Sequence, residues 1–423
     1  MQHVIIGNGP AGVIAAETIR KHAPDDSIVL IGDEPEPPYS RMAIPYLLQG
    51  QIDESGTYLR KNAGHFDRLR IQHLQARVVG IDSAARQLAL DDGATIGFDK
   101  LLLATGSIPL DAPVPGIDSP GVHHCWTLAD ARAIMALAVP GARVVQLGAG
   151  FIGCIILEAL AARDVQLTVV EMGERMVPRM MGEGAGKMIR RWCESKGVTV
   201  HIGTRVEAII EQRPGTNPPL EVRLSNGVLL AADLVISATG VRPNIGFLEQ
   251  SGIRCLQGIL VDDTMQTSVP GIYAAGDCAE AFDRVTGQTI VSAIQPNAAS
   301  QAYCAAMNMV GRHALQPGVT QINVLDTLGL VSVSFGQWQG VPGGQQVELT
   351  DADAYRHVRL EFERDVLIGA NAIGLTEHVG VLRGLIESRV KLGAWKDVLL
   401  ADPTRLPEAY IATVTPQQAR RGA

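Results

Sequence analysis

The chain has 423 residues, of which 46% are hydrophobic and 19% are charged, and its formal net charge is −8. This composition excludes a disordered protein, and the acidic balance with only 4% aromatic residues argues against a nucleic-acid partner. No run of about 18 apolar residues is present, so no membrane span is expected. The chain opens on an apolar strand without the features of a signal peptide, and the expected location is cytoplasmic.

Two stretches of the chain, residues 3–106 and 143–240, repeat one order of expected elements. Each has an apolar strand, a glycine-rich turn, a helix, a second strand that ends at an acidic residue, a hairpin, and a last strand before Ala-Thr-Gly. In the first copy the turn, the acid and the triplet are Gly7, Gly9, Pro10, Ala11, Gly12, Asp33, Ala104, Thr105 and Gly106. In the second copy the corresponding residues include Gly148, Gly150, Phe151, Ile152, Gly153, Glu171 and Gly240.

A Gly-x-Gly-x-x-Gly turn between a strand and a helix is typical of dinucleotide binding. The first glycine makes the tight turn, the second lets the backbone approach a pyrophosphate, and the third lets helix and strand pack closely. The anion then lies at the helix N-terminus, where free N–H groups favour negative charge. An acid about 20 residues later accepts hydrogen bonds from ribose hydroxyls. Both copies meet these conditions, so the sequence predicts two dinucleotide sites.

A third motif follows the second copy, and it is an apolar strand that ends in Gly276 and Asp277. With this motif, the Pro38-Tyr39-Ser40-Arg41 segment and the Gln295-Pro296-Asn297-Ala298 segment, the chain resembles the FAD/NAD(P)-dependent pyridine nucleotide-disulfide oxidoreductase superfamily. Within it, these segments are similar to the NADH-dependent rubredoxin and ferredoxin reductases and to the apoptosis-inducing-factor-like flavoproteins without a redox-active cysteine.

The resemblance implies an α/β fold with two Rossmann-like three-layer dinucleotide-binding domains, as in glutathione reductase, and a C-terminal α+β domain. The FAD-binding domain is expected at residues 1–110 and 241–317, the NAD(P)-binding domain at 111–240, and an interface domain at 318–423, which suggests a homodimer. Asp277 is then expected at the FAD ribityl chain. Further FAD contacts implied by the resemblance are Arg41, Val78, Gly276 and Gln295.

Several residues depart from the pattern of the relatives. The six cysteines form no Cys-x-x-Cys or redox Cys-x-x-x-x-Cys pair, and no cluster with histidines suggests a metal site. Met42 stands where related oxidases and peroxidases carry a single redox cysteine. Tyr46 and Ile155 replace a lysine–glutamate pair of the ferredoxin reductases, and both are expected near the nicotinamide site. An external acceptor must therefore take electrons directly from the flavin.

These features predict an FAD-dependent NADH:acceptor oxidoreductase, a flavoprotein that acts in electron transfer. The expected acceptor is an iron–sulfur or rubredoxin-type protein or a partner redox subunit, and the reverse direction, reduction of NAD, uses the same parts. Two alternatives stay open: an NADH oxidase or diaphorase that uses oxygen or quinone, and a flavin-stabilised binding or signalling protein. NAD(H) is preferred to NADP(H) because the Glu171 carboxylate repels a 2′-phosphate, although Arg175 could soften this preference.

Overall fold

The computed structural model describes residues 1–421, with side chains placed through Val414, so the last two residues of the predicted C-terminal domain lie outside it. The chain divides into two compact units. The first unit consists of Met1–Ile108 and Val241–Val319. The second consists of Pro109–Gly240 and the residues from Thr320 onward.

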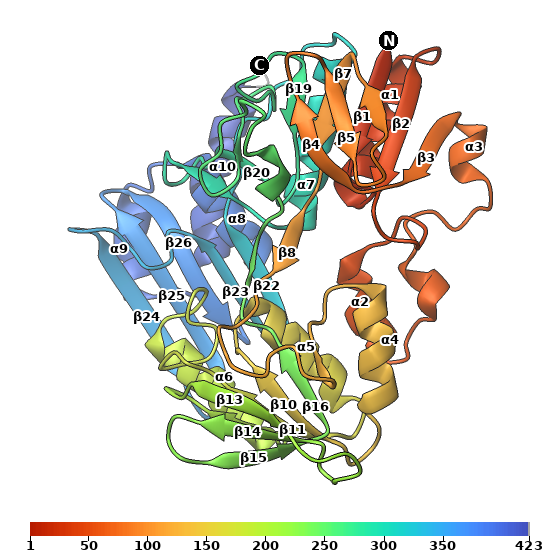
Figure 1. Ribbon diagram of the computed structural model, residues 1–423. Coiled ribbons are helices and arrows are strands. Elements are labelled where there is room, and N and C mark those ends of the chain that lie inside the picture. Colours follow the sequence, from red (N-terminus) through yellow and green to blue (C-terminus); the bar gives the residue numbers. More distant parts are fainter. Residues whose placement is uncertain (422–423) are drawn as a thin grey trace. The chain divides into compact units, whose positions relative to one another are not determined.

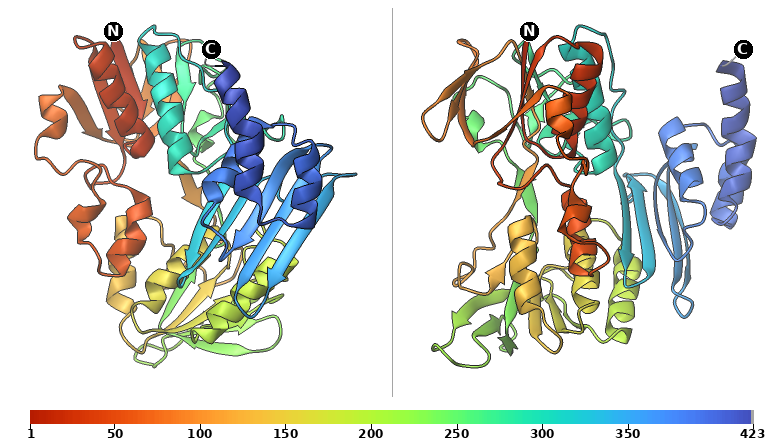
Figure 2. Two further views of the ribbon diagram at one scale, coloured as in Figure 1. Left: turned by 180° about the vertical axis from the view of Figure 1, so that it is seen from behind. Right: turned by 90° about the vertical axis from the view of Figure 1, so that its right-hand side faces the viewer.

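The first unit is built on a five-stranded parallel sheet (Figure 1). Its strand order is β19 (Ile272–Ala274), β7 (Lys100–Leu103), β1 (Gln2–Ile6), β2 (Ser27–Gly32) and β3 (Ile71–Gln75). Strands β1, β2 and β7 are almost continuously apolar and buried, as expected for a parallel sheet covered on both faces. Helices α1 (Pro10–His22) and α7 (Gln295–Met309) pack against each other beside this sheet (Figure 2).

Smaller elements complete the first unit. One hairpin sheet contains β4 (Val78–Asp82), β5 (Gln87–Leu90) and β6 (Thr95–Gly97), and another contains β18 (Ile259–Leu260), β20 (Ala279–Phe282) and β21 (Thr289–Val291). Strands β8 (Ser107–Pro109) and β17 (Val241–Pro243) form a two-stranded sheet. The short helical segments are Arg41–Ala43, α2 (Ile44–Leu48), Glu54–Thr57, α3 (His65–Arg68) and Gly246–Leu248.

The second unit repeats this plan with a second parallel sheet. Its strand order is β12 (Thr199–His201), β11 (Gln166–Val170), β10 (Arg143–Leu147), β16 (Leu234–Ser237) and β9 (Val122–His123). Its helices are α4 (Leu128–Leu137), α5 (Phe151–Ala161) and α6 (Glu183–Ser195). The hairpin sheet of this copy contains β13 (Val206–Glu211), β14 (Leu220–Leu224) and β15 (Leu229–Ala232).

The second unit also contains a five-stranded antiparallel sheet. Its strand order is β22 (Ile322–Thr327), β23 (Leu330–Gly336), β26 (Val366–Ile373), β25 (Arg356–Glu363) and β24 (Gln345–Asp351). Helices α8 (Val379–Ser388), α9 (Ala394–Ala401) and α10 (Leu406–Arg421) follow, and α8 and α10 lie on the side of this sheet away from α5 and α6 (Figure 2). The predicted α/β fold with two dinucleotide folds and a C-terminal α+β part is thus confirmed, whereas the division into three domains stays a prediction.

Among the described residues, no helix is both long and apolar enough to cross a membrane.

Candidate functional site

The first glycine turn joins β1 to α1 with the geometry that a phosphate loop requires. Gly7 has φ +107, and a Cβ there would lie 2.0 Å from the Ala104 carbonyl oxygen. A Cβ at Gly12 would lie 1.8 Å from the Gly7 carbonyl oxygen, so the helix packs too closely on the turn for any side chain. At Gly9, in contrast, a Cβ would meet nothing within 4 Å. The turn therefore presents bare, open backbone at the N-terminus of α1, which suits an approaching pyrophosphate.

The second turn, between β10 and α5, repeats this arrangement. Gly148 has φ +95, and a Cβ there would lie 2.5 Å from the Ala238 carbonyl oxygen. A Cβ at Gly153 would lie 2.5 Å from the Gly148 carbonyl oxygen, while Gly150 faces open space. The same division of roles among three glycines thus appears in both units.

A buried amide that the sequence analysis missed supports the second turn. Gln146 lies in β10 and is completely buried, and its Nε2 donates to the carbonyl oxygens of Gly148 at 2.9 Å and Gly153 at 3.0 Å. These two bonds connect the start of the turn to the first turn of α5. The available signal was a polar residue within an otherwise apolar buried strand, where a hydrogen-bond partner is required.

The acidic residue of the second copy is held by backbone N–H groups. One carboxylate oxygen of Glu171 accepts from the Ala149 N–H at 2.7 Å, and the other accepts from the Gly173 N–H at 2.7 Å. A carboxylate has about four lone-pair positions, so each oxygen can still accept from a ribose hydroxyl. In the first copy Asp33 is about half exposed and forms an ion pair with Arg77 at 3.5 Å.

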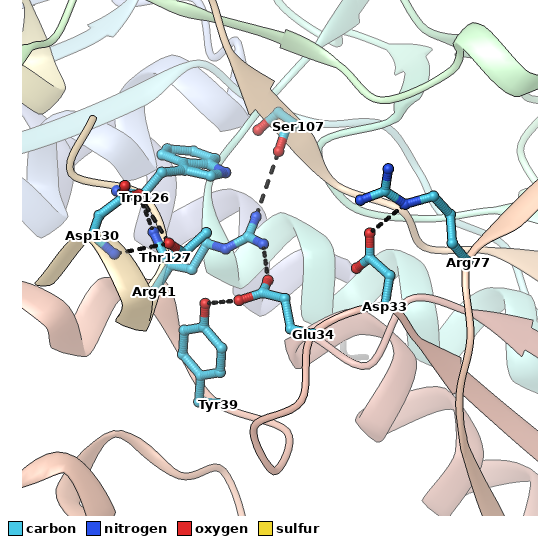
Figure 3. A network of polar contacts seen from close by, with 9 residues as sticks. All are labelled: Asp33, Glu34, Tyr39, Arg41, Arg77, Ser107, Trp126, Thr127 and Asp130. Carbon is cyan, nitrogen blue, oxygen red and sulfur yellow. Dashed lines mark hydrogen bonds and ion pairs between the residues drawn. The ribbon is translucent and has the colours of Figure 1, made fainter. Parts of the chain in front are cut away.

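Beside Asp33, the first unit contains a polar network around Arg41 (Figure 3). The Arg41 guanidinium contacts Glu34 Oε1 at 2.5 Å and donates to the Ser107 carbonyl oxygen at 3.5 Å. The Tyr39 hydroxyl donates to the other carboxylate oxygen of Glu34 at 2.6 Å. Arg41 was expected here from the sequence, whereas Glu34 was not, and its place directly after Asp33 is the only signal that it offers. The network fixes the segment that follows β2 beside the β7–β8 connection.

Asp277 lies at the carboxyl end of β19, beside the same connection. The Ser107 hydroxyl donates to Asp277 Oδ2 at 2.9 Å. Burial raises the pKa of Asp277, and the hydrogen bond from Ser107 and the positive charge of Arg41 oppose this rise. The structure thus brings together Asp277 and Arg41, two of the predicted cofactor-binding residues. A partly buried carboxylate in this position suits the hydroxyls of a ribityl chain, which are hydrogen-bond donors.

Four further predicted residues of the first unit have the following positions and contacts. Gly276 has φ +82, and its N–H donates to the buried Gln301 Oε1 at 2.8 Å, a contact that the sequence did not indicate. Gln295 begins α7, and its Oε1 accepts from the Ser40 hydroxyl at 3.4 Å. Val78 is buried in β4. The Thr105 hydroxyl donates to the Asn244 carbonyl oxygen at 2.8 Å.

The residues expected near the nicotinamide lie in different units. Tyr46 is in α2 of the first unit and is 52% exposed, and Ile155 is in α5 of the second unit and is half-buried. Their approach to one nicotinamide stays a prediction. Figure 3 also draws Trp126, Thr127 and Asp130 of the second unit, where the Thr127 and Asp130 side chains form a capping box at the start of α4.

None of the six cysteines forms a disulfide, and burial raises the pKa of each thiol. The pKa reaches about 12 at Cys125 and Cys193 and about 11 at Cys304. A thiolate is the reactive form of cysteine, so all six side chains are poorly suited to redox chemistry at neutral pH. Met42, at the position of the related redox cysteine, is 54% exposed. Within the described residues, no cluster of histidine, cysteine, aspartate or glutamate is placed to hold a metal ion.

Comparison with known proteins identifies the class to which these two dinucleotide folds belong. The family description "Pyridine nucleotide-disulphide oxidoreductase" matches residues 1–302. The chain is 31% identical over 406 residues to the NADH-dependent phenylglyoxylate dehydrogenase subunit epsilon of Aromatoleum evansii, with 95% of each chain covered. It is 32% identical over 416 residues to the anthranilate 1,2-dioxygenase system ferredoxin--NAD(+) reductase component of Burkholderia cepacia, with 95% of this chain and 97% of the relative covered.

Among solved structures, the chain has a TM-score of 0.88 to a chain of the covalent putidaredoxin reductase–putidaredoxin complex. This similarity covers 97% of this chain and 98% of that chain at 24% identity, and it shows a common fold. The chain belongs to the pyridine nucleotide-disulphide oxidoreductase family. The predicted family and the glutathione-reductase-like fold class are therefore confirmed, and the protein is a flavoprotein oxidoreductase that uses FAD and a nicotinamide dinucleotide.

Proposed function

We propose that this protein transfers electrons from NADH through FAD to an iron–sulfur or rubredoxin-type protein or to a partner redox subunit. The observation that carries the proposal is a pair of phosphate turns in a chain whose six cysteines form no disulfide and which has Met42 at the position of the related redox cysteine. The names of the two relatives support the same kind of reaction. One is a ferredoxin--NAD(+) reductase component, and the other is a subunit of an NADH-dependent dehydrogenase.

FAD fits the first unit according to the geometry of its residues. The turn at Gly9 and the N-terminus of α1 bind the pyrophosphate, and Asp33 accepts from ribose hydroxyls. Asp277 accepts from ribityl hydroxyls while Ser107 holds its carboxylate in place. Bound FAD supplies the chemistry of accepting a hydride and releasing single electrons, and the protein supplies binding, orientation and electrostatics. The N-terminus of α7, fifteen residues long, adds partial positive charge that stabilises a reduced, anionic ring.

The second unit binds the nicotinamide dinucleotide, and its geometry favours NADH over NADPH. The two backbone N–H groups on Glu171 hold a full negative charge where a 2′-phosphate would lie. Arg175, which could have compensated, instead donates from Nε to the Met181 carbonyl oxygen at 2.9 Å and from Nη2 to that of Pro178 at 3.3 Å. Its guanidinium is therefore engaged within its own loop.

Near the nicotinamide, Tyr46 and Ile155 supply shape and one hydroxyl in place of a charge pair. A reduced flavin without a nearby lysine is stabilised less than one beside a lysine, so we expect a lower flavin potential than in relatives with the lysine. Residues 318–423 are our proposed interface for a homodimer, and a sedimentation measurement tests this proposal.

The decisive experiment is anaerobic stopped-flow reduction of the FAD-loaded protein, followed by reoxidation. NADH should reduce the flavin faster than NADPH does, and a [2Fe–2S] ferredoxin or a rubredoxin should reoxidise it faster than oxygen or a quinone. Fastest reoxidation by oxygen or quinone would instead support an NADH oxidase or diaphorase. Reduction too slow to sustain turnover with any acceptor would support a binding or signalling protein.

A further inference from the structure

Residues 172–182 join β11 to α6 directly after Glu171, and we call this segment the β11–α6 loop. The loop is tied to the second glycine turn by its backbone, because the Val177 N–H donates to the Ala149 carbonyl oxygen at 2.8 Å. Ala149 also donates its N–H to Glu171, and Glu171 accepts from Gly173 within the loop. These hydrogen bonds join the loop, the glycine turn and the Glu171 carboxylate, so a shift of the loop would also shift the carboxylate.

The loop adopts a conformation that its own sequence disfavours. Val177 has φ +45, in the left-handed region that β-branched residues avoid because of steric crowding at Cβ. Such strain persists only where the surrounding structure determines the conformation from outside. The bond from Val177 to Ala149 supplies one of these constraints, and it acts from the glycine-turn side.

A second constraint comes from the C-terminal sheet. Asn371 in β26 is completely buried, and its Nδ2 donates to the Met180 carbonyl oxygen at 3.0 Å. Its Oδ1 accepts from the N–H of Gly182, which is the N-cap residue of α6, at 3.3 Å. The neighbouring residues Ala370 and Ala372 are buried and apolar, and they lie on the other face of the sheet because side chains alternate along a strand. Outside its own strand, the side-chain amide of Asn371 thus bonds to two backbone groups, and both belong to the β11–α6 loop.

We propose that Asn371 is a positioning residue for nucleotide binding: it holds the β11–α6 loop from the C-terminal sheet, so that Glu171 and Ala149 keep the geometry that receives the adenosine end of NAD(H). The proposal rests on the proposed binding of NAD(H) by the second unit. A neutral amide suits this role because it pairs with one carbonyl and one N–H at the same time. An apolar residue in its place would remove the partner of the buried Met180 carbonyl oxygen and of the partly buried Gly182 N–H.

The test uses Asn371→Ala in the FAD-loaded protein and calorimetric titration with NAD⁺ and with ADP-ribose. The dissociation constants of both ligands should rise about tenfold and by the same factor, because ADP-ribose keeps the whole adenosine end of NAD⁺ and lacks only the nicotinamide. Flavin content should be unchanged, and the kcat with NADH should stay within about twofold while its KM rises. The control is Asn323→Ala, since Asn323 lies in β22 of the same sheet and its Nδ2 donates at 3.3 Å to the Ser334 hydroxyl, which belongs to β23 and not to the loop.

Hydrogen exchange without nucleotide provides the second readout. The amides of the β11–α6 loop should exchange faster in Asn371→Ala than in the wild type or in Asn323→Ala. Unchanged dissociation constants, unchanged loop exchange, or equal effects in the two variants would overturn the inference. A wild-type protein that binds neither ligand would refute the proposed function, and loop exchange would still decide whether Asn371 holds the loop. If Asn371→Ala does not fold, Asn371→Ser takes its place with the same expectations.

Discussion

A pair of single substitutions tests which turn binds which dinucleotide. Gly9 and Gly150 are the middle glycines of the two turns, and a Cβ at either position would meet no atom within 4 Å. Their backbone angles are φ −71, ψ −171 at Gly9 and φ −76, ψ −169 at Gly150, which an alanine adopts readily. Gly9→Ala and Gly150→Ala should therefore fold normally, while each methyl group projects into the space that a pyrophosphate would fill.

The effect of each substitution on the stability of the fold and its effect on dinucleotide binding differ in size and in sign. Replacement of glycine by alanine at an unstrained position stabilises a protein by about 0.4–1 kcal/mol, because the unfolded chain loses freedom. Displacement of the pyrophosphate should cost about two hydrogen bonds from backbone N–H groups to a charged phosphate, each contributing roughly 1.5–3 kcal/mol. The sum of about 3–6 kcal/mol corresponds to a loss of affinity of at least about 100-fold, at 1.4 kcal/mol per factor of ten.

The assay is a titration of the flavin-free protein with FAD and of the FAD-loaded protein with NAD⁺, together with urea denaturation of each variant. Gly9→Ala should weaken FAD binding alone, and Gly150→Ala should weaken NAD⁺ binding while flavin content stays at the wild-type level. Loss of FAD in Gly150→Ala with normal NAD⁺ binding, or unchanged binding in both variants, would falsify the assignment of the two turns.

Three further predictions concern charge and thiol chemistry. Because burial raises the pKa of Asp277, its ionised form destabilises the flavin-free fold as the pH rises through that pKa. Asp277→Asn should therefore raise the urea midpoint at pH 7 but not below about pH 4, and it should weaken FAD binding; equal midpoints at pH 7 would contradict this reasoning. Glu171→Ala should lower the ratio of the NADH to the NADPH reduction rate by a factor that corresponds to roughly 1–3 kcal/mol. Equal rates with NADH and NADPH in the wild type would refute the NADH preference. Alkylation with iodoacetamide at pH 7.5 should leave NADH-to-dye transfer unchanged, since burial raises the pKa of Cys125 to about 12; loss of activity that tracks one modified cysteine would revive a thiol relay.

The local parts of the two dinucleotide folds could be predicted from the sequence alone. The strand, the glycine turn and the helix are adjacent along the chain, and steric limits on φ specify where glycine must stand, as at Gly7 and Gly148. The hairpin expected in each copy turns at Asp92-Gly93, between β5 and β6, and at Asn226-Gly227, between β14 and β15, because these dipeptides favour tight turns. The apolar strand before Asp277 could likewise be predicted from residues that are adjacent in the sequence.

The contacts that hold the turns in place were decided by the tertiary structure. The Gln146 side chain donates to the Gly153 carbonyl oxygen in the first turn of α5. The Asn371 side chain donates to the β11–α6 loop from a strand nearly two hundred residues later in the chain. Glu34 and Arg41 find each other within a loop whose path no periodicity specifies. A buried amide or carboxylate reveals only that it needs a partner, because desolvation is costly for any polar group. Which partner satisfies it depends on the path that the backbone takes in the folded chain, and for Asn371 that path brings together segments nearly two hundred residues apart.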